Sequence, residues 1–343
     1  GATSQDAMDT GLVLQLRDAL ALIEADLATL AETLSRQALL HADTPLVGRT
    51  WLQHATPVTL GMKLAGILGA VTRHRQRLQE LRPRLLVLQF GGASGSLAAL
   101  GSKALPVAEG LAAQLKLTLP EQPWHTQRDR LVEFASVLGL IAGSLGKLGR
   151  DVSLLMQTEA GEVFEPSAPG KGGSSTMPHK RNPVGCVAAI AAATRVPGLL
   201  STLFTAMPQP HERAAGQWHA EWDTVPEIVR LCAGSLAQVS VVVQGLQLDR
   251  ARMQAHLDSH GGLLYAEAVT VTLAGTLGKA AAHALVEQAA RRALDQSRHL
   301  HEVLQQMPEV TAHLSPAQLQ ALFAADSWRG MADTWIDRVL AQR

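Results

Sequence analysis

A serine and a lysine that could together handle a proton lie six positions apart, at Ser174 and Lys180, in a stretch rich in glycine, proline and serine. A serine hydroxyl can act as a base when backbone donors and a nearby ammonium group stabilise its alkoxide. In the opposite direction the same hydroxyl can deliver the proton. Ser174 and Lys180 are therefore the candidate catalytic residues, for a reaction in which a proton is transferred.

The residues that end this stretch could bind an anion. Lys180, Arg181 and Asn182 directly precede Pro183, and proline favours the first turn of a helix. Two cations, an amide and the free backbone N–H groups of a helix start would then converge. Composition alone leaves open that residues 164–175 are an ordinary surface linker.

The segments around this loop have the patterning of long helices. Apolar residues recur at spacings of three and four after Thr3 and Ser4, which are good helix-capping residues. Alternating β-branched runs are absent apart from the ambiguous stretch 239–243, and aromatic residues make up only 3% of the chain. The predicted class is all-α, a bundle of long helices. The expected helices follow Ser4 as far as residues 43–45, run from 57 to 83 and from about 127 to 159, open at Pro183, and extend from about 222 to 257.

The pattern of apolar segments in the sequence changes after about Gln247. Shorter apolar segments follow, and glycine and proline break them at 261–262, 307–308 and 315–316. We therefore expect a central long-helix domain over residues 1–247, which carries the active-site segments, and a small C-terminal helical domain over 248–343.

The bulk composition argues against several classes of partner. Lysine plus arginine equals aspartate plus glutamate at 30 each, so no overall charge gathers nucleic acid or an acidic membrane. Apolar runs such as residues 85–88 are too short to cross a bilayer. The two cysteines, Cys186 and Cys232, make neither a disulfide framework nor a metal-type pair, which suits a reducing compartment. We expect a soluble, cytoplasmic protein with no nucleic-acid or membrane partner.

Other polar groups have simpler explanations. His256 and His260 lie one helical turn apart without the glutamate of a zinc-binding helix, and glycines follow at once, so helix-end polar residues are favoured over a metal site. The glycine-rich turn at 91–95 lacks the lysine of a phosphate-binding loop, which favours a tight helix connection. For residues 211–213 and for His219, substrate contact and a solvated surface remain open.

The loop is also where a family resemblance appears. Residues 173–183 read Gly-Ser-Ser-Thr-Met-Pro-His-Lys-Arg-Asn-Pro, which resembles the signature of the fumarase/aspartase superfamily almost letter for letter. Residues 1–10 resemble the first substrate-binding segment of that superfamily, and residues 48–57 resemble the second. Further likeness at 91–96, 157–159 and 334–340 extends the resemblance over essentially the whole chain.

The resemblance implies roles for individual residues. Ser174 would be the catalytic serine, and Lys180 and Asn182 would bind one carboxylate of a small dicarboxylate or tricarboxylate substrate. The other residues that it places at the substrate are Thr3, Ser4, Gln5, Thr50, Trp51, Gln53, His54, Ser175 and Met177. No metal and no organic cofactor is expected.

The resemblance also implies an assembly. Members are usually homotetramers in which each site draws its three segments from different subunits, so we expect self-association to a homotetramer. Members carry a further helical domain before the segment that corresponds to Gly1, and we expect that domain to be absent from this chain.

Two positions depart from the pattern of most lyases in the superfamily. Trp51 replaces a histidine of the second segment, and Val187 replaces a glutamate seven positions beyond the loop lysine. In relatives this pair is thought to protonate a strongly basic leaving group, whereas a carboxylate, whose conjugate acid has a pKa of about 4, needs no proton. The expected activity is therefore the lactonisation of 3-carboxy-cis,cis-muconate, a tricarboxylate, in aromatic degradation through the beta-ketoadipate pathway.

Two alternatives remain. A C–N lyase of the adenylosuccinate-lyase type shares the start motif and residues 180–182, although Trp51 and Val187 argue against it. A non-catalytic helical scaffold could retain the fold, but it would need neither Ser174 nor Lys180.

Overall fold

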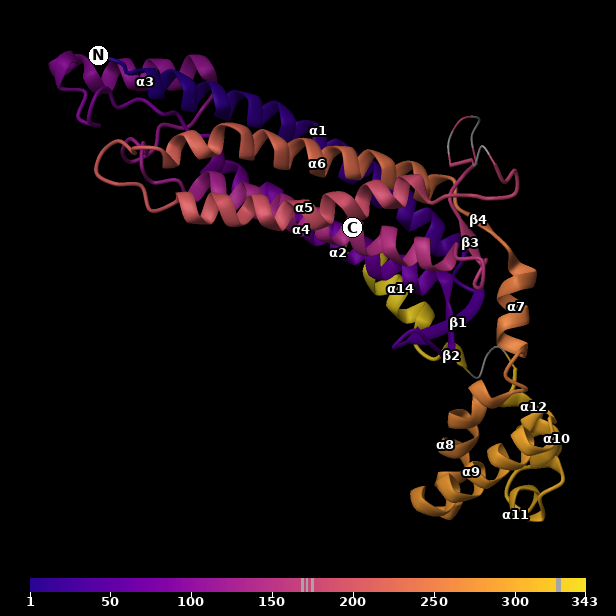
Figure 1. The fold of residues 1–343 in the computed structure, drawn as a ribbon. Coiled ribbons are helices and arrows are strands. Elements are labelled where there is room, and N and C mark those ends of the chain that lie inside the picture. Colours follow the sequence, from indigo (N-terminus) through magenta and orange to yellow (C-terminus); the bar gives the residue numbers. More distant parts are fainter. Residues whose placement is uncertain (168–169, 171, 174–175, 325–327) are drawn as a thin grey trace. The chain divides into compact units, whose positions relative to one another are not determined.

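The computed structural model of residues 1–343 describes the chain except for residues 168–169, 171, 174–175 and 325–327. Long helices dominate the fold (Figure 1), which confirms the all-α class. The chain divides into two compact units, each built from three segments. Unit 1 comprises Gly1–Thr33, Gly69–Leu154 and Phe164–Leu246, and unit 2 comprises Leu34–Leu68, Leu155–Val163 and Gln247–Arg343.

Unit 1 is a bundle of long helices that run beside one another (Figure 1). Its helices are α1 (Ser4–Leu40) and α2 (Leu60–Leu85), whose other ends belong to unit 2, with α4 (Asp129–Leu155), α5 (Val184–Ala206) and α6 (Gln217–Gln244). A 3-10 turn, η1 (Ala98–Lys103), leads into the shorter α3 (Ala104–Leu115). Fully buried leucines of α1 at the predicted spacing, such as Leu20, Leu27 and Leu30, form part of its core.

Small residues let α4 and α5 approach closely. A Cβ added to Gly146 would lie 2.3 Å from the Cβ of Ala193, and one added to Gly149 would lie 2.9 Å from the carbonyl oxygen of Cys186. These distances leave no room for a side chain. The glycines therefore weaken α4 as an isolated helix but allow its backbone to pack directly against α5.

Unit 2 contains an antiparallel hairpin, β1 (Pro45–Thr50) and β2 (Gln53–Thr59), and a group of short helices. Val269, Leu300 and Val310, all fully buried, are part of a core shared by the helices between Ala266 and Ala321. The helices and the 3-10 turn η2 are α7 (Arg250–Asp258), η2 (Leu263–Tyr265), α8 (Ala266–Leu277), α9 (Lys279–Asp295), α10 (Leu300–Gln305), α11 (Pro308–Thr311), α12 (Pro316–Ala321) and α14 (Ala332–Leu340). Two further strands are very short, β3 (Val163–Phe164) and β4 (Gln247–Leu248).

The structure corrects three of the expected elements. Residues 45–59 form a hairpin where no strand was predicted, and α2 therefore begins at Leu60 rather than at Pro57. Pro83 does not end α2, which continues to Leu85. The last expected long helix is two helices, because α6 ends at Gln244 before Gly245 and α7 starts only at Arg250.

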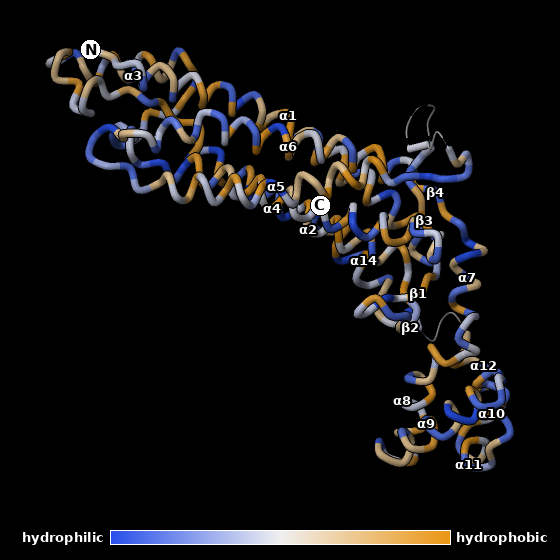
Figure 2. The backbone as a smooth tube through the Cα atoms, viewed as in Figure 1, coloured by the Kyte–Doolittle hydropathy of each residue, from blue (hydrophilic) through white to orange (hydrophobic). Residues whose placement is uncertain are grey.

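Three helices are apolar over most of their length, although the sequence analysis considered only short uninterrupted apolar runs. By length and composition α4, α5 and α6 could each cross a membrane, although no single uninterrupted apolar run is long. Packing within this chain buries 61% of the relevant window of α4 but only 28% of that of α5 and 39% of that of α6. Figure 2 shows hydrophobic residues along the whole length of the bundle. Much apolar surface of α5 and α6 is therefore uncovered in a single chain.

Candidate active site

The loop that carries the predicted catalytic residues leads into α5. The structure describes Met177, Lys180 and Asn182, whereas Ser174 and Ser175 lie outside the described residues. The backbone N–H of Asn182 donates to the carbonyl of Gly172 at 2.8 Å, and that of Lys180 donates to the carbonyl of Met177 at 3.0 Å. Met177 and Lys180 are exposed and Asn182 is partly exposed, so these side chains remain accessible to a ligand.

A buried carboxylate already occupies the start of α5. Glu165 accepts the backbone N–H groups of Gly185 at 3.0 Å and of Cys186 at 2.6 Å. A guanidinium N–H of Arg181 donates to the carbonyl of Glu165 at 2.6 Å, and this guanidinium lies over the ring of Phe164. The expectation of free N–H groups at this helix start is therefore wrong, because an internal anion uses them. The prediction that Lys180 and Asn182 bind a substrate carboxylate therefore concerns their side chains alone.

A second internal carboxylate, that of Asp6, lies in the first turn of α1. It accepts the backbone N–H groups of Thr3, Gly91 and Gly92 at 2.8 to 3.0 Å. This contact explains the glycine-rich turn as a tight connection, since a Cβ on Gly92 would lie 2.5 Å from the carbonyl oxygen of Gly1. The turn donates its N–H groups to Asp6 rather than to a phosphate.

Side-chain donors complete the environment of Asp6. Nε2 of His125 lies 2.8 Å from one carboxylate oxygen, and the amide of Gln89 donates to the same oxygen at 3.0 Å. Burial by itself would raise the pKa of Asp6, but the hydrogen bonds from His125, Thr3, Gln89 and Gly92 outweigh it and lower the pKa from 3.8 to about 2.

The three predicted binding residues at the start of α1 have different surroundings. Gln5 is buried, and its amide donates to Asp9 and to the carbonyl of His125, so those donors are used inside the chain. Ser4 is exposed. The hydroxyl of Thr3 accepts a hydrogen bond from Arg213 at 2.9 Å. This contact places a cation, which the sequence left undecided, beside the predicted carboxylate-binding segment.

A buried ion cluster that the sequence analysis missed stands next to this end of α1. The fully buried guanidinium of Arg128 pairs with Asp9 at 2.7 Å and with Glu221 at 2.5 Å. Burial raises the pKa of Glu221, and Asp9 adds to that effect against the opposing effect of Arg128. One cation serves two carboxylates, so the cluster carries an excess negative charge when both are ionised. Only the contact across the bundle identifies it, because its members lie far apart in the sequence.

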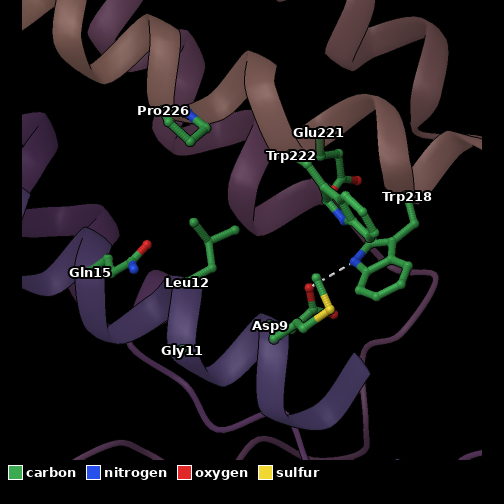
Figure 3. Close-up of a pocket in the computed structure, with 9 residues that line it drawn as sticks. Asp9, Gly11, Leu12, Gln15, Trp218, Glu221, Trp222 and Pro226 are labelled. Atoms are coloured by element: carbon green, nitrogen blue, oxygen red, sulfur yellow. Dashed lines mark hydrogen bonds between the residues drawn. The ribbon is translucent and has the colours of Figure 1, made fainter. Parts of the chain in front are cut away.

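The two carboxylate residues of the cluster, Asp9 and Glu221, line a cavity of about 400 Å³ between α1 and α6 (Figure 3). Asp9, Leu12 and Gln15 project from α1, while Trp218, Glu221 and Trp222 project from α6. The indole N–H of Trp218 donates to Asp9 at 3.1 Å. His219, for which the sequence left substrate contact open, is exposed, whereas its neighbours Trp218 and Glu221 are buried in unit 1.

The second predicted segment forms the tip of the β1–β2 hairpin. Thr50 pairs with Gln53, which leaves Trp51 and Leu52 as a two-residue turn. Both turn residues have positive φ, 53° and 65°, and expose 97% and 74% of their surface. The left-handed conformation costs about 1–2 kcal/mol for a residue with a side chain, and glycine or asparagine usually takes such positions. An exposed, strained, apolar tip is a candidate contact surface.

His54 lies one residue inside this tip and faces α7. Its Nδ1 is 2.7 Å from Nε2 of His260, and its ring centroid is 5.5 Å from that of His256. The interpretation of His256 and His260 as simple helix-end residues is thus incomplete. Among the residues that the structure describes, no group of histidine, cysteine, aspartate or glutamate has the arrangement of a metal site.

Within unit 1 the predicted segments do not meet. The start of α1, marked N in Figure 1, and the segment leading into α5 lie at opposite ends of the bundle. These two predicted binding segments are therefore distant from each other in the same chain. A site that uses both segments requires more than one copy of the chain.

Comparisons with known proteins agree with the loop motif. The family described as "Lyase" matches residues 1–198, and "Adenylosuccinate lyase C-terminus" matches residues 262–339. The chain is 73% identical to a 3-carboxy-cis,cis-muconate cycloisomerase of Pseudomonas putida, over 93% of this chain and 76% of that protein. A relative of the same name from Pseudomonas aeruginosa is 67% identical over 100% of this chain and 74% of its own length.

Solved structures give the same result. The crystal structure of the 3-carboxy-cis,cis-muconate lactonizing enzyme from Pseudomonas putida matches with a TM-score of 0.94 and 70% identity. The match covers 100% of this chain and 76% of that chain, so the sequence spans about three quarters of its relatives' length. The chain belongs to the lyase family, within the fumarase/aspartase superfamily that its loop motif predicted.

Proposed function

We propose that this chain is a cofactor-independent cycloisomerase that converts 3-carboxy-cis,cis-muconate to 4-carboxymuconolactone. The observation that carries the proposal is the identity of 73% to a relative of that activity, which covers both the loop and the hairpin. The reaction belongs to aromatic degradation through the beta-ketoadipate pathway.

The residues present suit an intramolecular addition. A carboxylate oxygen bonds to the adjacent alkene carbon while a proton is added at the carbon α to another carboxylate, through an enolate-like dianion. Ser174 supplies the proton, and Lys180 and Asn182 stabilise the developing charge. In reverse the leaving group is a carboxylate, which needs no proton. This chemistry has no use for the histidine and glutamate that Trp51 and Val187 replace.

Both replaced positions are on the surface of the single chain. Trp51 is 97% exposed on the hairpin tip and Val187 is 54% exposed on α5. An ionisable pair would cost little there in an isolated chain, so the reason for its replacement lies in the assembled site. A tryptophan fills that site with apolar volume and favours the folded conformer of the substrate.

We further propose that the chain assembles into a homotetramer whose sites combine segments from different copies. Two observations support this proposal, namely the separation of the α1 start from the loop and the uncovered apolar surface of α5 and α6. Members of the exposed apolar set on these helices are Val184, Val187, Phe204, Trp222 and Val241. Helices of other copies would cover this surface, so no lipid is needed. Light scattering after gel filtration without detergent tests the proposal, and a stable monomer would contradict it.

We also propose a cytoplasmic location. Cys186 and Cys232 are both buried, and burial raises the pKa of Cys232 to about 12, which makes its thiol unreactive. Reduced thiols suit a reducing compartment. Cell fractionation with detection of the native protein tests this placement, and recovery with periplasm or membranes would overturn it.

The activity has a direct test. Lactonisation destroys a conjugated diene, so the ultraviolet absorbance of 3-carboxy-cis,cis-muconate should fall when the protein is added without any cofactor. Adenylosuccinate, assayed in parallel, represents the C–N lyase alternative. Cleavage of adenylosuccinate without loss of the diene would overturn the proposed function, and inactivity on both would favour a scaffold.

A further inference from the structure

The turn end of the β1–β2 hairpin is held by a cluster of charged and aromatic side chains, here called the hairpin anchor. Its members are Arg49, His54, Glu162, His256 and His260, all within unit 2. Apart from His54, which the family resemblance places at the substrate, none of these residues has a role in the chemistry described above. They lie directly behind the strained tip formed by Trp51 and Leu52.

Glu162 is the centre of the hairpin anchor. Its carboxylate is fully buried and accepts two hydrogen bonds from the guanidinium of Arg49, at 2.8 and 2.9 Å. One of its oxygens is also 2.6 Å from Nδ1 of His256 on α7. Its backbone carbonyl accepts the N–H of Asp249, the residue that caps α7. One residue therefore ties the end of β1 to both ends of α7.

The two hairpin strands are held at the same cross-strand pair. Arg49 and His54 are cross-strand partners, one pair below the turn. Glu162 binds the first of them, and His260 hydrogen-bonds the second at 2.7 Å. Because both strands are anchored directly behind the turn, residues 51 and 52 have little freedom to relax out of the left-handed region.

We propose that the hairpin anchor holds Trp51 and Leu52 in their left-handed conformation, so that the tip is presented rigidly to the substrate. Arg49, Glu162 and His260 are then positioning residues for the reaction. This inference rests on the proposed function, because it assigns the tip to the substrate-binding site. It also explains how a strained turn without glycine can persist on an exposed hairpin.

The hairpin anchor should respond to pH. A hydrogen bond between two imidazoles needs one unprotonated nitrogen, so a second proton would place two cations 2.7 Å apart. Burial, Arg49, His260 and His256 all lower the pKa of His54, while Glu162 opposes them. The unprotonated form of His54 is therefore favoured at neutral pH. Acidification breaks the contact, and the tip is released on the β2 side.

A double-mutant cycle between Glu162→Gln and Leu52→Gly tests the proposal. Glutamine keeps the shape of Glu162 but removes the charge that holds Arg49 and His256, and we expect kcat/KM to fall about 100-fold through misplacement of the tip. Glycine adopts a positive φ without strain. In the Leu52→Gly background, Glu162→Gln should therefore lower kcat/KM by less than about 10-fold. An equal loss in both backgrounds would overturn the proposal.

A milder variant covers the case in which Glu162→Gln does not fold. In His260→Gln the glutamine amide can still hydrogen-bond His54 but does not titrate. We expect the acid limb of kcat/KM to move to lower pH, whereas the matched surface variant His313→Gln should retain the original limb. An unchanged profile in His260→Gln would remove the histidine pair from the mechanism.

Thermal unfolding of the same cycle separates this inference from the proposed function. Leu52→Gly should raise Tm in the otherwise unchanged protein, because it removes strain, but not in Glu162→Gln, where the tip has already relaxed. Equal shifts in both backgrounds would reject the hairpin anchor whatever the substrate is. Absence of diene loss with the unchanged protein would reject only the proposed function.

Discussion

At the scale of single residues, Asp6 and Glu165 are internal carboxylates that bind backbone N–H groups near the starts of α1 and α5. Glu165 accepts backbone N–H groups at the start of α5, which the sequence analysis had assigned to a substrate anion. Asp6 accepts the N–H group of Thr3, directly before α1, together with those of Gly91 and Gly92. A helix start attracts negative charge from any source, and a tethered carboxylate is present at a far higher local concentration than a metabolite. We therefore expect the side chains around these sites, rather than the helix starts themselves, to select the substrate.

Replacement of Asp6 by asparagine should destabilise the protein at neutral pH. The carboxyl has a pKa of about 2 when folded and 3.8 as its ordinary value, so its ionised form contributes about 2 kcal/mol above pH 4. Since the folded pKa is the lower one, this contribution is lost as the pH falls from about 4 toward 2. Thermal unfolding of Asp6→Asn and of the unchanged protein should show a gap in Tm at pH 7 that narrows below pH 4. A gap independent of pH would show that the charge is not involved.

Replacement of Ser174 by alanine should abolish turnover while binding is largely retained. The serine is assigned to the proton, and proton transfer by a positioned group contributes about 10²–10⁴-fold in rate. The diene assay measures turnover, and quenching of tryptophan fluorescence by substrate measures binding. Ser201→Ala, on the exposed face of α5, is the matched control and should remain active. A near-normal rate in Ser174→Ala would remove this serine from the mechanism.

At the scale of elements, glycines on a single helix should differ sharply in their tolerance of a methyl group. A Cβ on Gly146 meets Ala193 at 2.3 Å, whereas Gly143, one turn away on α4, has nothing within 4 Å. We expect Gly146→Ala to destabilise the protein by about 1–3 kcal/mol through overpacking. Gly143→Ala should be neutral or stabilising by up to about 1 kcal/mol, because alanine favours the helix. Chemical denaturation compares the two, and equal effects would contradict the packing of α4 on α5.

The hairpin is the element that sequence reasoning missed. Two-residue hairpin turns are usually signalled by asparagine or glycine, and Trp51 with Leu52 carries neither signal. Pro57, inside β2, also argued against a strand. The turn exists because contacts from α7 and from Glu162 fix both strands, and those contacts are not visible in local sequence.

At the scale of the whole molecule, the apolar surface of α5 should determine assembly. Phe204 exposes 55% of its surface there, and a charge at this position would be buried without a partner in any interface that covers it. We expect Phe204→Glu to lower the mass measured by light scattering and to reduce turnover strongly, since one chain does not bring the α1 start to the loop.

The control for this experiment lies in unit 2. Leu294, on α9, is 63% exposed, and Leu294→Glu should leave both mass and activity unchanged. Dissociation in both variants would indicate general destabilisation, and an unaltered mass in Phe204→Glu would exclude this surface from the interface.

The sequence by itself determined the class, the long helices and the family. Helical periodicity is local, and the motif at 173–183 is contiguous, so both can be recognised in the sequence without knowledge of the fold. The same holds for Trp51 and Val187. Because neither side chain can donate a proton to a leaving group, the two residues favoured a lactonisation over a C–N lyase reaction before any contact was known.

Only the tertiary structure decided which of those residues are free to act. In the fold, the amide of Gln5 donates to Asp9, and the N–H group of Cys186 at the start of α5 donates to Glu165. The fold also brings together Arg128, Asp9 and Glu221 from distant segments. It also placed the start of α1 and the segment that leads into α5 at opposite ends of the bundle within unit 1. The physical reason is that hydrogen bonds and ion pairs form between whichever groups packing places within about 3 Å, and the order of the chain does not record that placement.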